Sequence, residues 1–278
     1  MQTARYNMKR VISFDIGIKN LAYCLGTYKP TQEWNVEKWG VLDLSGFKQP
    51  SCQTCGKNAT FMFKDVPYCG KHCRATGGKP IPKGCSGNLM KKKLVDLKTI
   101  GNEIGVIDSE TIIKKADLIN KIQIYLTESC YSKVTGPKAS QVDMIEIGRQ
   151  MAKQLDSLLK RTRIDSVLVE NQIGTIATRM RTIQGMVYQY FILRHPNASI
   201  QTISAHNKLN ITLPAQIKNK IPEVLTASYK DRKKSGVLIT RLWLEDRGDK
   251  LWLAQFIASK KKDDLADSLL QMIWYVQS

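Results

Sequence analysis

The chain has 278 residues, and its 43 Lys and Arg against 24 Asp and Glu give a formal net charge of +19 and a pI of about 9.6. Hydrophobic residues make up 42% of it, and no apolar run reaches the roughly 20 residues that cross a bilayer. The composition excludes a membrane-spanning chain and favours one large or two modest domains with a polyanionic partner.

The first elements in chain order are predicted to be strands. Residues 11–28 form two strands joined by a tight turn at 17–20, and residues 36–44 form a third. Residues 49–88 are rich in Cys, Gly and Pro, which predicts an insertion held by something other than a core. Residues 89–130 predict helices with a loop near 105–111.

The second half alternates helices and strands. Residues 141–162 place Met144, Ile147, Met151 and Leu155 at helical spacing. The remaining elements are a strand at 165–170, a helix at 177–194, a strand at 199–204, and helices at 223–235 and 262–277. This order predicts an α/β fold around a mixed sheet. The predicted domains are a core of 1–48 and 131–278, with inserted modules at 49–88 and 89–130.

Acidic residues occur where local folding does not require them. Asp15 lies inside an apolar run, where a bare buried carboxylate would cost several kcal/mol, and Glu170 closes the apolar strand. Asp264 and Asp267, three residues apart at the start of the last helix, face the same side. Carboxylates that converge suit Mg²⁺ and phosphodiester cleavage. Asp263 lies four residues before Asp267, so spacing alone leaves Asp263 and Asp264 open.

Three segments together resemble the RuvC-type Holliday junction resolvases, in the branch of large DNA viruses and fungal mitochondria. They are Ser13–Ala22 (SFDIGIKNLA), Val169–Gln172 (VENQ) and Lys262–Ser268 (KDDLADS), within a resemblance that covers roughly 10–48 and 140–278. The resemblance implies a ribonuclease H-like fold with a mixed five-stranded sheet and flanking helices. It also implies a homodimer that resolves four-way DNA junctions by paired nicks, and four metal-binding, catalytic acids: Asp15, Glu170, Asp264 and Asp267.

The resemblance therefore predicts a structure-selective DNA endonuclease that uses two Mg²⁺ ions, with Mn²⁺ as a substitute. Predicted DNA contacts are Lys19, Arg179, Arg181 and Lys261, the last of which would steady charge on the scissile phosphate. Two alternatives stay open. One is a ribonuclease H-like nuclease acting on other branched DNA or on RNA–DNA hybrid, and the other is a non-catalytic nucleic-acid-binding protein.

Four of the seven cysteines lie within 52–73. Cys52-x₂-Cys55 followed by Cys69-x₂-His72-Cys73 has the spacing of a structural site for one zinc ion. This spacing leaves His72 and Cys73 open as the fourth ligand, and the resemblance of residues 68–72 (YCGKH) to the second half of small viral zinc modules favours His72. Zinc-bound thiolates favour a reducing, intracellular compartment, and the sequence leaves cytoplasm, nucleus and mitochondrion open.

Residues 94–126 resemble a SAP motif, a helix-loop-helix module that binds DNA. Leu94, Leu97, Ile100 and Ile104 are predicted to form the apolar face of the first helix, and 113–122 the second helix. The alternative is an ordinary helical hairpin that packs on the core.

Overall fold

The computed structural model describes the chain except residues 1–7, 30, 32, 109, 173–177 and 222–228. It contains two compact units. The first combines Met1–Gly46 with Pro137–Ser278, and the second is Phe47–Gly136. No helix among the described residues is long and apolar enough to cross a membrane.

A five-stranded sheet forms the centre of the first unit. Its order is β3 (Trp34–Asp43), β2 (Asn20–Tyr28), β1 (Lys9–Ile16), β8 (Ser166–Glu170) and β9 (Ser199–Ile203). Strand β2 runs antiparallel to β1 and β3, whereas β1, β8 and β9 are parallel. The α/β fold around a mixed five-stranded sheet, which the sequence predicted, is therefore confirmed.

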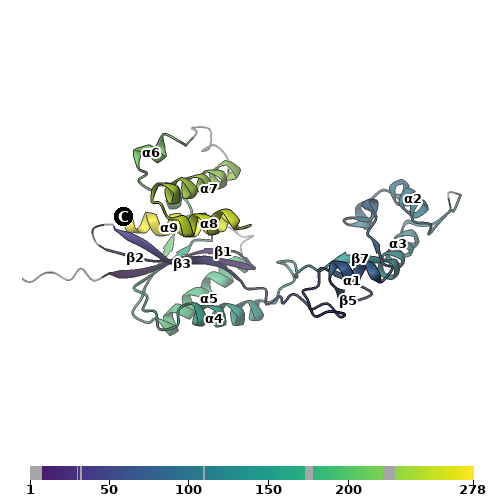
Figure 1. Ribbon diagram of the computed structural model, residues 1–278, viewed down its shortest axis with the longest axis horizontal. Helices are drawn as coiled ribbons and strands as arrows, with labels where there is room; N and C mark the ends of the chain where they lie inside the picture. Colours follow the sequence, from purple (N-terminus) through teal and green to yellow (C-terminus); the bar gives the residue numbers. More distant parts are fainter. Residues whose placement is uncertain (1–7, 30, 32, 109, 173–177, 222–228) are drawn as a thin grey trace, which may run out of the picture. The chain divides into compact units, whose positions relative to one another are not determined.

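Helices cover both faces of this sheet (Figure 1). One face carries α4 (Met144–Leu158) and α5 (Thr178–Arg194), and the other carries α7 (Tyr229–Asp246), α8 (Lys250–Ala258) and α9 (Lys262–Gln277). Short helices at η4 (Asn207–Leu209) and α6 (Ala215–Lys218) follow β9. The predicted strands and helices of the core are present, but η4, α6 and α8 were not predicted, and α7 continues to Asp246 whereas the prediction ended at 235. Residues 177 and 223–228 of the predicted helices lie outside the described residues.

The alternation of side chains along β1 decides which residues meet α9. Ile12, Phe14 and Ile16 belong to the hydrophobic cluster on the α4 and α5 side, and Val11 belongs to the cluster on the α9 side. Because successive side chains of a strand point to opposite faces, Asp15 faces the α9 side together with Val11 and Ser13.

Buried hydrogen bonds hold α9 against the sheet. The hydroxyl of Ser13, fully buried, donates to the carbonyl of Ser268 at 2.5 Å, and Trp39 Nε1 donates to the carbonyl of Leu265 at 3.0 Å. Leu269 of α9 is fully buried. Burying one such side chain stabilises a fold by about 1.5–3 kcal/mol. The rotation of α9 about its axis is thereby fixed relative to β1.

The second unit contains a small sheet and a helical hairpin. The sheet order is β5 (Val66–Tyr68), β4 (Phe61–Phe63), β7 (Cys130–Lys133) and β6 (Lys79–Pro80). The helices are α1 (Gly70–Ala75), η1 (Lys83–Cys85), η2 (Leu89–Lys91), α2 (Leu94–Glu103) and α3 (Lys115–Ser129). Because β7 pairs with β4 and β6, the chain stays in this unit until Gly136, whereas the sequence analysis let the core resume at 131.

The helical hairpin packs chiefly on itself and on the segment before it. Its hydrophobic cluster contains buried residues of both helices, one residue between them and two residues that precede α2. These are Leu97 and Ile100 of α2, Leu118, Ile119 and Ile122 of α3, Ile107 between the helices, and Cys85 and Leu89 before α2. Leu94, which the sequence analysis placed on the apolar face, is 38% exposed because it opens the helix. The two inserted modules thus share one compact unit, and DNA binding by the hairpin stays a prediction.

Candidate functional site

Three carboxylates from distant segments converge at one edge of the sheet. The parallel register pairs Phe14 with Val169, so Asp15 and Glu170 lie side by side at the carboxyl ends of β1 and β8. Asp267 projects from the second turn of α9. One oxygen from each of the three carboxylates lies within 4.8 Å of the others. They line a cavity of about 510 Å³.

A lysine that the sequence analysis did not select lies among these carboxylates. Lys208 Nζ is 2.5 Å from Asp267 Oδ2 and 3.5 Å from Glu170 Oε2, with 16% of its side chain exposed. Lys208 belongs to η4, just after β9. Since β1, β8 and β9 are parallel, polar residues after β9 reach the same sheet edge as Asp15 and Glu170, and that signal could have found it.

The electrostatics of the cavity favour additional positive charge. Burial raises the pKa of Asp15 well above its usual value, and the neighbouring Glu170 and Asp267 raise it further. Burial also raises the pKa of Asp267, against the opposing effect of Lys208. The pKa of Lys208 is raised in spite of its burial, because Asp267 and Glu170 stabilise its charged form. One ammonium group therefore does not balance three buried carboxylates.

The donor set fits a divalent metal ion. Glu170 Oε2 is buried and accepts no hydrogen bond from any of the described residues, and the ammonium group of Lys208, which hydrogen-bonds to Asp267, lies 3.5 Å from it. A buried carboxylate oxygen without a hydrogen bond is costly unless a cation coordinates it, and carboxylate oxygens are the ligands that Mg²⁺ prefers. Asp15, Glu170 and Asp267 could thus hold such an ion, and three of the four predicted acids are brought together.

The fourth predicted acid lies on the wall of the same cavity. Asp264 Oδ2 is 3.5 Å from Lys261 Nζ, and both residues line the cavity, but Asp264 is not part of the close group. Burial raises the pKa of Asp264 and the adjacent Asp263 adds to the effect. Asp263 instead pairs with Lys233 at 2.9 Å. Of the two alternatives left open by spacing, Asp264 is the one that faces the acidic cavity.

The other predicted DNA contacts donate to backbone carbonyls. Lys19 Nζ donates to the carbonyl of Pro137 at 2.7 Å, and Arg181 Nε donates to the carbonyl of Gln172 at 3.1 Å. Arg179 donates to the carbonyls of Ser140 and Val142, before α4. These contacts give all three side chains a structural role, and contacts to phosphate stay a prediction for them.

A second group of metal-binding residues lies in the unit Phe47–Gly136. Cys52, Cys55, Cys69 and His72 each place one ligand atom within 4.8 Å of the others. His72 Nδ1 is 3.5 Å from the sulfur atoms of Cys52 and Cys69, and the sulfur atoms of Cys55 and Cys69 are 3.9 Å apart. Tetrahedral zinc, with bonds of about 2.3 Å to sulfur and 2.0–2.1 Å to nitrogen, needs separations of roughly 3.8 and 3.6 Å.

The thiol chemistry of this group also suits a metal. Burial acts to raise the pKa of Cys52, but hydrogen bonds from the backbone of Cys69 and from His72 outweigh it and lower that pKa to about 5. Cys52 is therefore a thiolate at neutral pH, the form that binds metals. Cys73, the alternative fourth ligand, is fully buried outside the group, and burial raises its pKa. The residues present favour His72.

Comparison with known proteins gives distant similarities. No family model matches the chain. An uncharacterized protein of Acanthamoeba polyphaga mimivirus is 24% identical over 96% of this chain and 74% of its own length. Among solved structures, the yeast mitochondrial Holliday junction resolvase Ydc2 aligns with a TM-score of 0.42 and 14% identity, over 99% of this chain and 82% of its own. The Fowlpox virus resolvase, solved with Holliday junction DNA, aligns with a TM-score of 0.43 and 14% identity, over 96% of each chain.

Proposed function

We propose that this protein is a metal-dependent endonuclease that resolves four-way DNA junctions. The observation that carries the proposal is the convergence of Asp15, Glu170 and Asp267 around a carboxylate oxygen without a hydrogen bond, in a chain of net charge +19. The three segments that resemble the RuvC-type resolvases include these acids in the same order along the sequence.

In this proposal the acids hold Mg²⁺ and the surrounding lysines stabilise phosphate. Asp15, Glu170 and Asp267 are the ligands, and Asp264 completes the set from the cavity wall. Divalent ions bound there would activate a water molecule and stabilise charge on the scissile phosphate. Lys208 offsets part of the carboxylate charge, and Lys261, on the wall beside Asp264, offers a cation to the same phosphate.

The remaining parts of the proposal concern assembly and the inserted unit. Cutting two strands symmetrically across a junction calls for two active sites related by a twofold axis, so we infer a homodimer. In the unit Phe47–Gly136 we infer one structural zinc held by Cys52, Cys55, Cys69 and His72. We also infer a reducing intracellular compartment, in which the cysteines do not form disulfides. The α2–α3 hairpin is inferred to add DNA affinity.

The test is a cleavage assay on matched substrates. Purified protein is incubated with a four-way junction, a flap, plain duplex and RNA–DNA hybrid, with Mg²⁺, with Mn²⁺ and with EDTA. The proposal expects paired nicks in the junction, with either metal ion and not with EDTA. Equal cleavage of the flap or the hybrid would instead favour the broader ribonuclease H-like nuclease.

A matched pair of variants separates catalysis from binding. Glu170→Gln keeps the size of the side chain but removes a ligand charge, so cleavage should fall below detection while junction binding in EDTA persists. Glu37→Gln, which changes the same group on β3 in an exposed pair with Arg10, should cleave as the parent does. Full activity of Glu170→Gln, or binding without cleavage by the unaltered protein, would overturn the assignment of a nuclease.

A further inference from the structure

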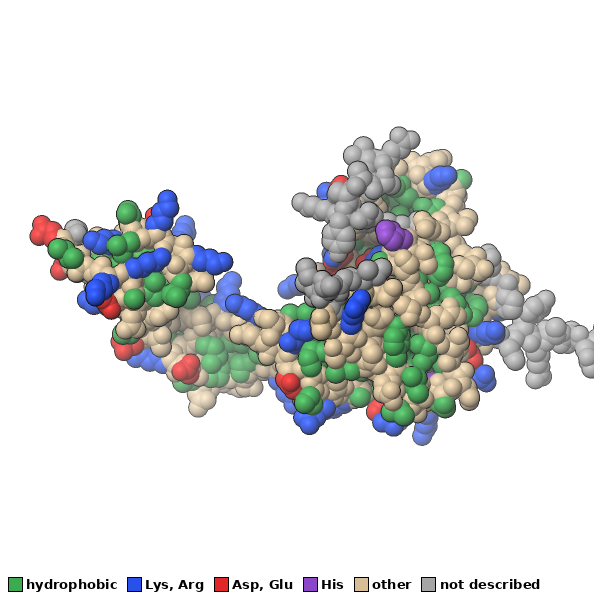
Figure 2. Space-filling model, turned by 180° about the vertical axis from the view of Figure 1, so that it is seen from behind, with side chains coloured by type: hydrophobic (Ala, Val, Ile, Leu, Met, Phe, Trp, Pro, Cys, Tyr) green, Lys and Arg blue, Asp and Glu red, His purple; other side chains and the backbone are tan. Residues whose placement is uncertain are grey.

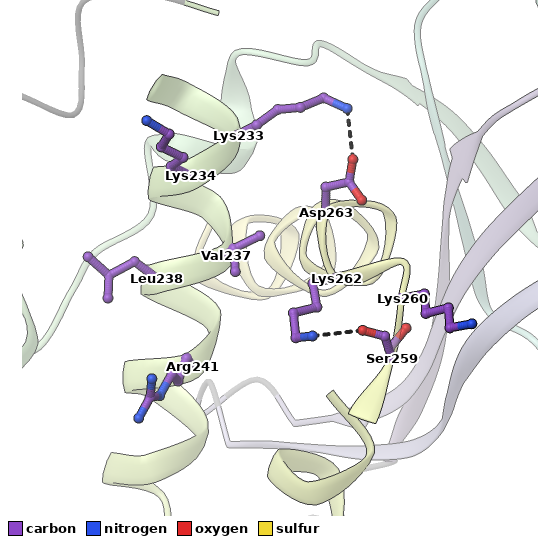
Figure 3. Close-up of a pocket in the computed structure, with 9 residues that line it drawn as sticks. All are labelled: Lys233, Lys234, Val237, Leu238, Arg241, Ser259, Lys260, Lys262 and Asp263. Atoms are coloured by element: carbon purple, nitrogen blue, oxygen red, sulfur yellow. Dashed lines mark hydrogen bonds and ion pairs between the residues drawn. The ribbon is translucent and has the colours of Figure 1, made fainter. Parts of the chain in front are cut away.

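A second hollow lies beside the acidic cavity, between α7 and the segment that leads into α9. Its volume is about 560 Å³. Figure 3 shows Lys233, Lys234 and Arg241 projecting from α7, with Lys233 directed toward Asp263, and Ser259 and Lys260 on the segment that leads into α9. We call this hollow the α7 groove.

The α7 groove is lined by an excess of positive charge. Five of its lining residues are cationic and one is acidic: Lys233, Lys234, Arg241, Lys260 and Lys262, against Asp263. On the face that Figure 2 shows, Lys and Arg side chains lie on both units. Val237 and Leu238 of α7 add apolar surface to the lining. A lining that combines cations with apolar surface suits a phosphodiester chain, whose phosphates meet the cations while the sugars cover the apolar surface.

Two of these cations have exposed carboxylate partners on their own helix. Lys234 lies 3.7 Å from Asp231 and Arg241 lies 2.7 Å from Glu245, and the side chains of both cations are about 60% exposed (60% and 59%). Exposed pairs of this kind contribute about 0–1 kcal/mol, so a phosphate can replace the carboxylate at little cost.

The groove and the acidic cavity adjoin each other through the start of α9. The side chains of residues 260–264 are divided between the two hollows. Lys260, Lys262 and Asp263 line the groove, whereas Lys261 and Asp264 line the cavity. Lys233 lines both. A strand whose phosphate lies at the acids therefore has a continuous cationic path past Lys233 into the groove.

We propose that the α7 groove binds the phosphates that neighbour the scissile phosphate on the cleaved DNA strand. This inference rests on the proposed function, whose active site supplies the scissile position. Lys234, from α7, and Lys260, from the segment that leads into α9, are assigned as phosphate contacts. The groove would thus fix the register of the strand relative to the acids.

The test compares two charge-matched double variants. Lys234→Gln with Lys260→Gln removes one exposed cation from each of these segments, and Lys153→Gln with Lys160→Gln removes two exposed cations on and just after α4, the helix on the other face of the sheet. Junction binding is measured in EDTA across a salt series, so that cleavage does not interfere. Circular dichroism verifies that both variants fold as the parent does.

Each neutralised phosphate contributes a slope of about 0.9 to the plot of log affinity against log salt for duplex DNA. Losing two contacts should lower the slope by about 1.8, which corresponds to roughly 60-fold weaker binding at 0.1 M salt relative to a 1 M reference. The α4 variant should keep the parental slope. Equal slopes for the two variants would overturn the proposal.

Phosphate ethylation interference locates the contacts. In the parent, ethylation of the phosphates next to the cleavage position should block binding, and in the groove variant that interference should disappear. Weaker binding with an unchanged interference pattern would mean that the groove acts only through long-range charge, which also overturns the proposal. Failure of the unaltered protein to cleave any branched DNA would refute the proposed function separately, because the binding comparison is made without cleavage.

Discussion

Replacing Lys208 with Met tests the electrostatic balance of the acidic cavity. The change removes the ammonium group and keeps most of the aliphatic chain. Lys208 and Asp267 each expose 16% of the side chain, and Glu170 exposes 12%, so this is a nearly buried network. Without Lys208, Glu170 and Asp267 would lose the cation that lies within ion-pair distance of both carboxylates.

The magnitude follows from the burial of the pair. Removing one partner of a buried ion pair costs about 3–5 kcal/mol, because the other charge stays buried and unpaired. The same change in an exposed pair costs about 0.2–1 kcal/mol. Lys29, 2.7 Å from Glu33 with 40% and 66% of the two side chains exposed, provides that control as Lys29→Met.

Urea unfolding followed by tryptophan fluorescence is the assay. All five tryptophans, Trp34, Trp39, Trp243, Trp252 and Trp274, lie in the unit that contains the acids, so the signal reports on that unit alone. In EDTA, Lys208→Met should lower the free energy of unfolding by about 3–5 kcal/mol, and Lys29→Met by less than about 1 kcal/mol.

Magnesium should reduce the loss caused by Lys208→Met, because a divalent cation bound only to the folded state stabilises it by mass action and here also relieves the carboxylate repulsion. It should leave the effect of Lys29→Met unchanged. A loss below 1 kcal/mol in EDTA, or one that Mg²⁺ does not reduce, would refute the view that the cavity is short of positive charge.

Three further predictions concern the two metal sites and the inserted unit. Asp15→Asn and Asp267→Asn should abolish junction cleavage and retain junction binding. Asp264→Asn should also be inactive, whereas Asp263→Asn should stay largely active in a cleavage assay. An active Asp264→Asn and an inactive Asp263→Asn would instead assign the catalytic role to Asp263. Cys52→Ser should lose about one zinc per chain by elemental analysis, whereas Cys73→Ser should keep it; absence of zinc from parental protein purified without chelators would refute the site. Replacing 47–136 with a short Gly-Ser linker should weaken binding to all DNA forms in a salt titration yet leave Mg²⁺-dependent cleavage at saturating DNA, and unchanged affinity would contradict a DNA-binding role for this unit.

The sheet could be predicted because its strands carry local signals. The apolar runs around Asp15 and before Glu170 are bounded by turn residues, and the order of strands and helices restricts the topology. Helix α8 was missed since its apolar side chains lack a clear helical stripe: Leu251 and Ile257 are exposed while Phe256 is buried. Its position depends on packing against α7 and α9, the helices that precede and follow it in the chain.

The boundary of the inserted unit could not be derived from composition. Residues 130–133 look like the end of a helical segment, yet they pair with Phe61–Met62 on one side and with Lys79–Pro80 on the other. Such pairing joins segments about 70 and 50 residues apart, and nothing local in β7 encodes its partners. By contrast, spacing alone indicated the candidate metal ligands Cys52, Cys55 and Cys69 and left His72 and Cys73 open, because two ligand pairs within one short segment can meet without a long-range fold.

The choice between Asp263 and Asp264 shows how the core determines the chemistry of the site. Successive residues of an α-helix are rotated by about 100°, so neighbouring acids at the start of α9 must face different surroundings. The bonds from Ser13 to Ser268 and from Trp39 to Leu265 fix the rotation of the helix. That rotation directs Asp264 and Asp267 to the acidic cavity and Asp263 to the α7 groove. Sequence spacing permitted either pairing with Asp267, and two buried hydrogen bonds to the sheet decide it.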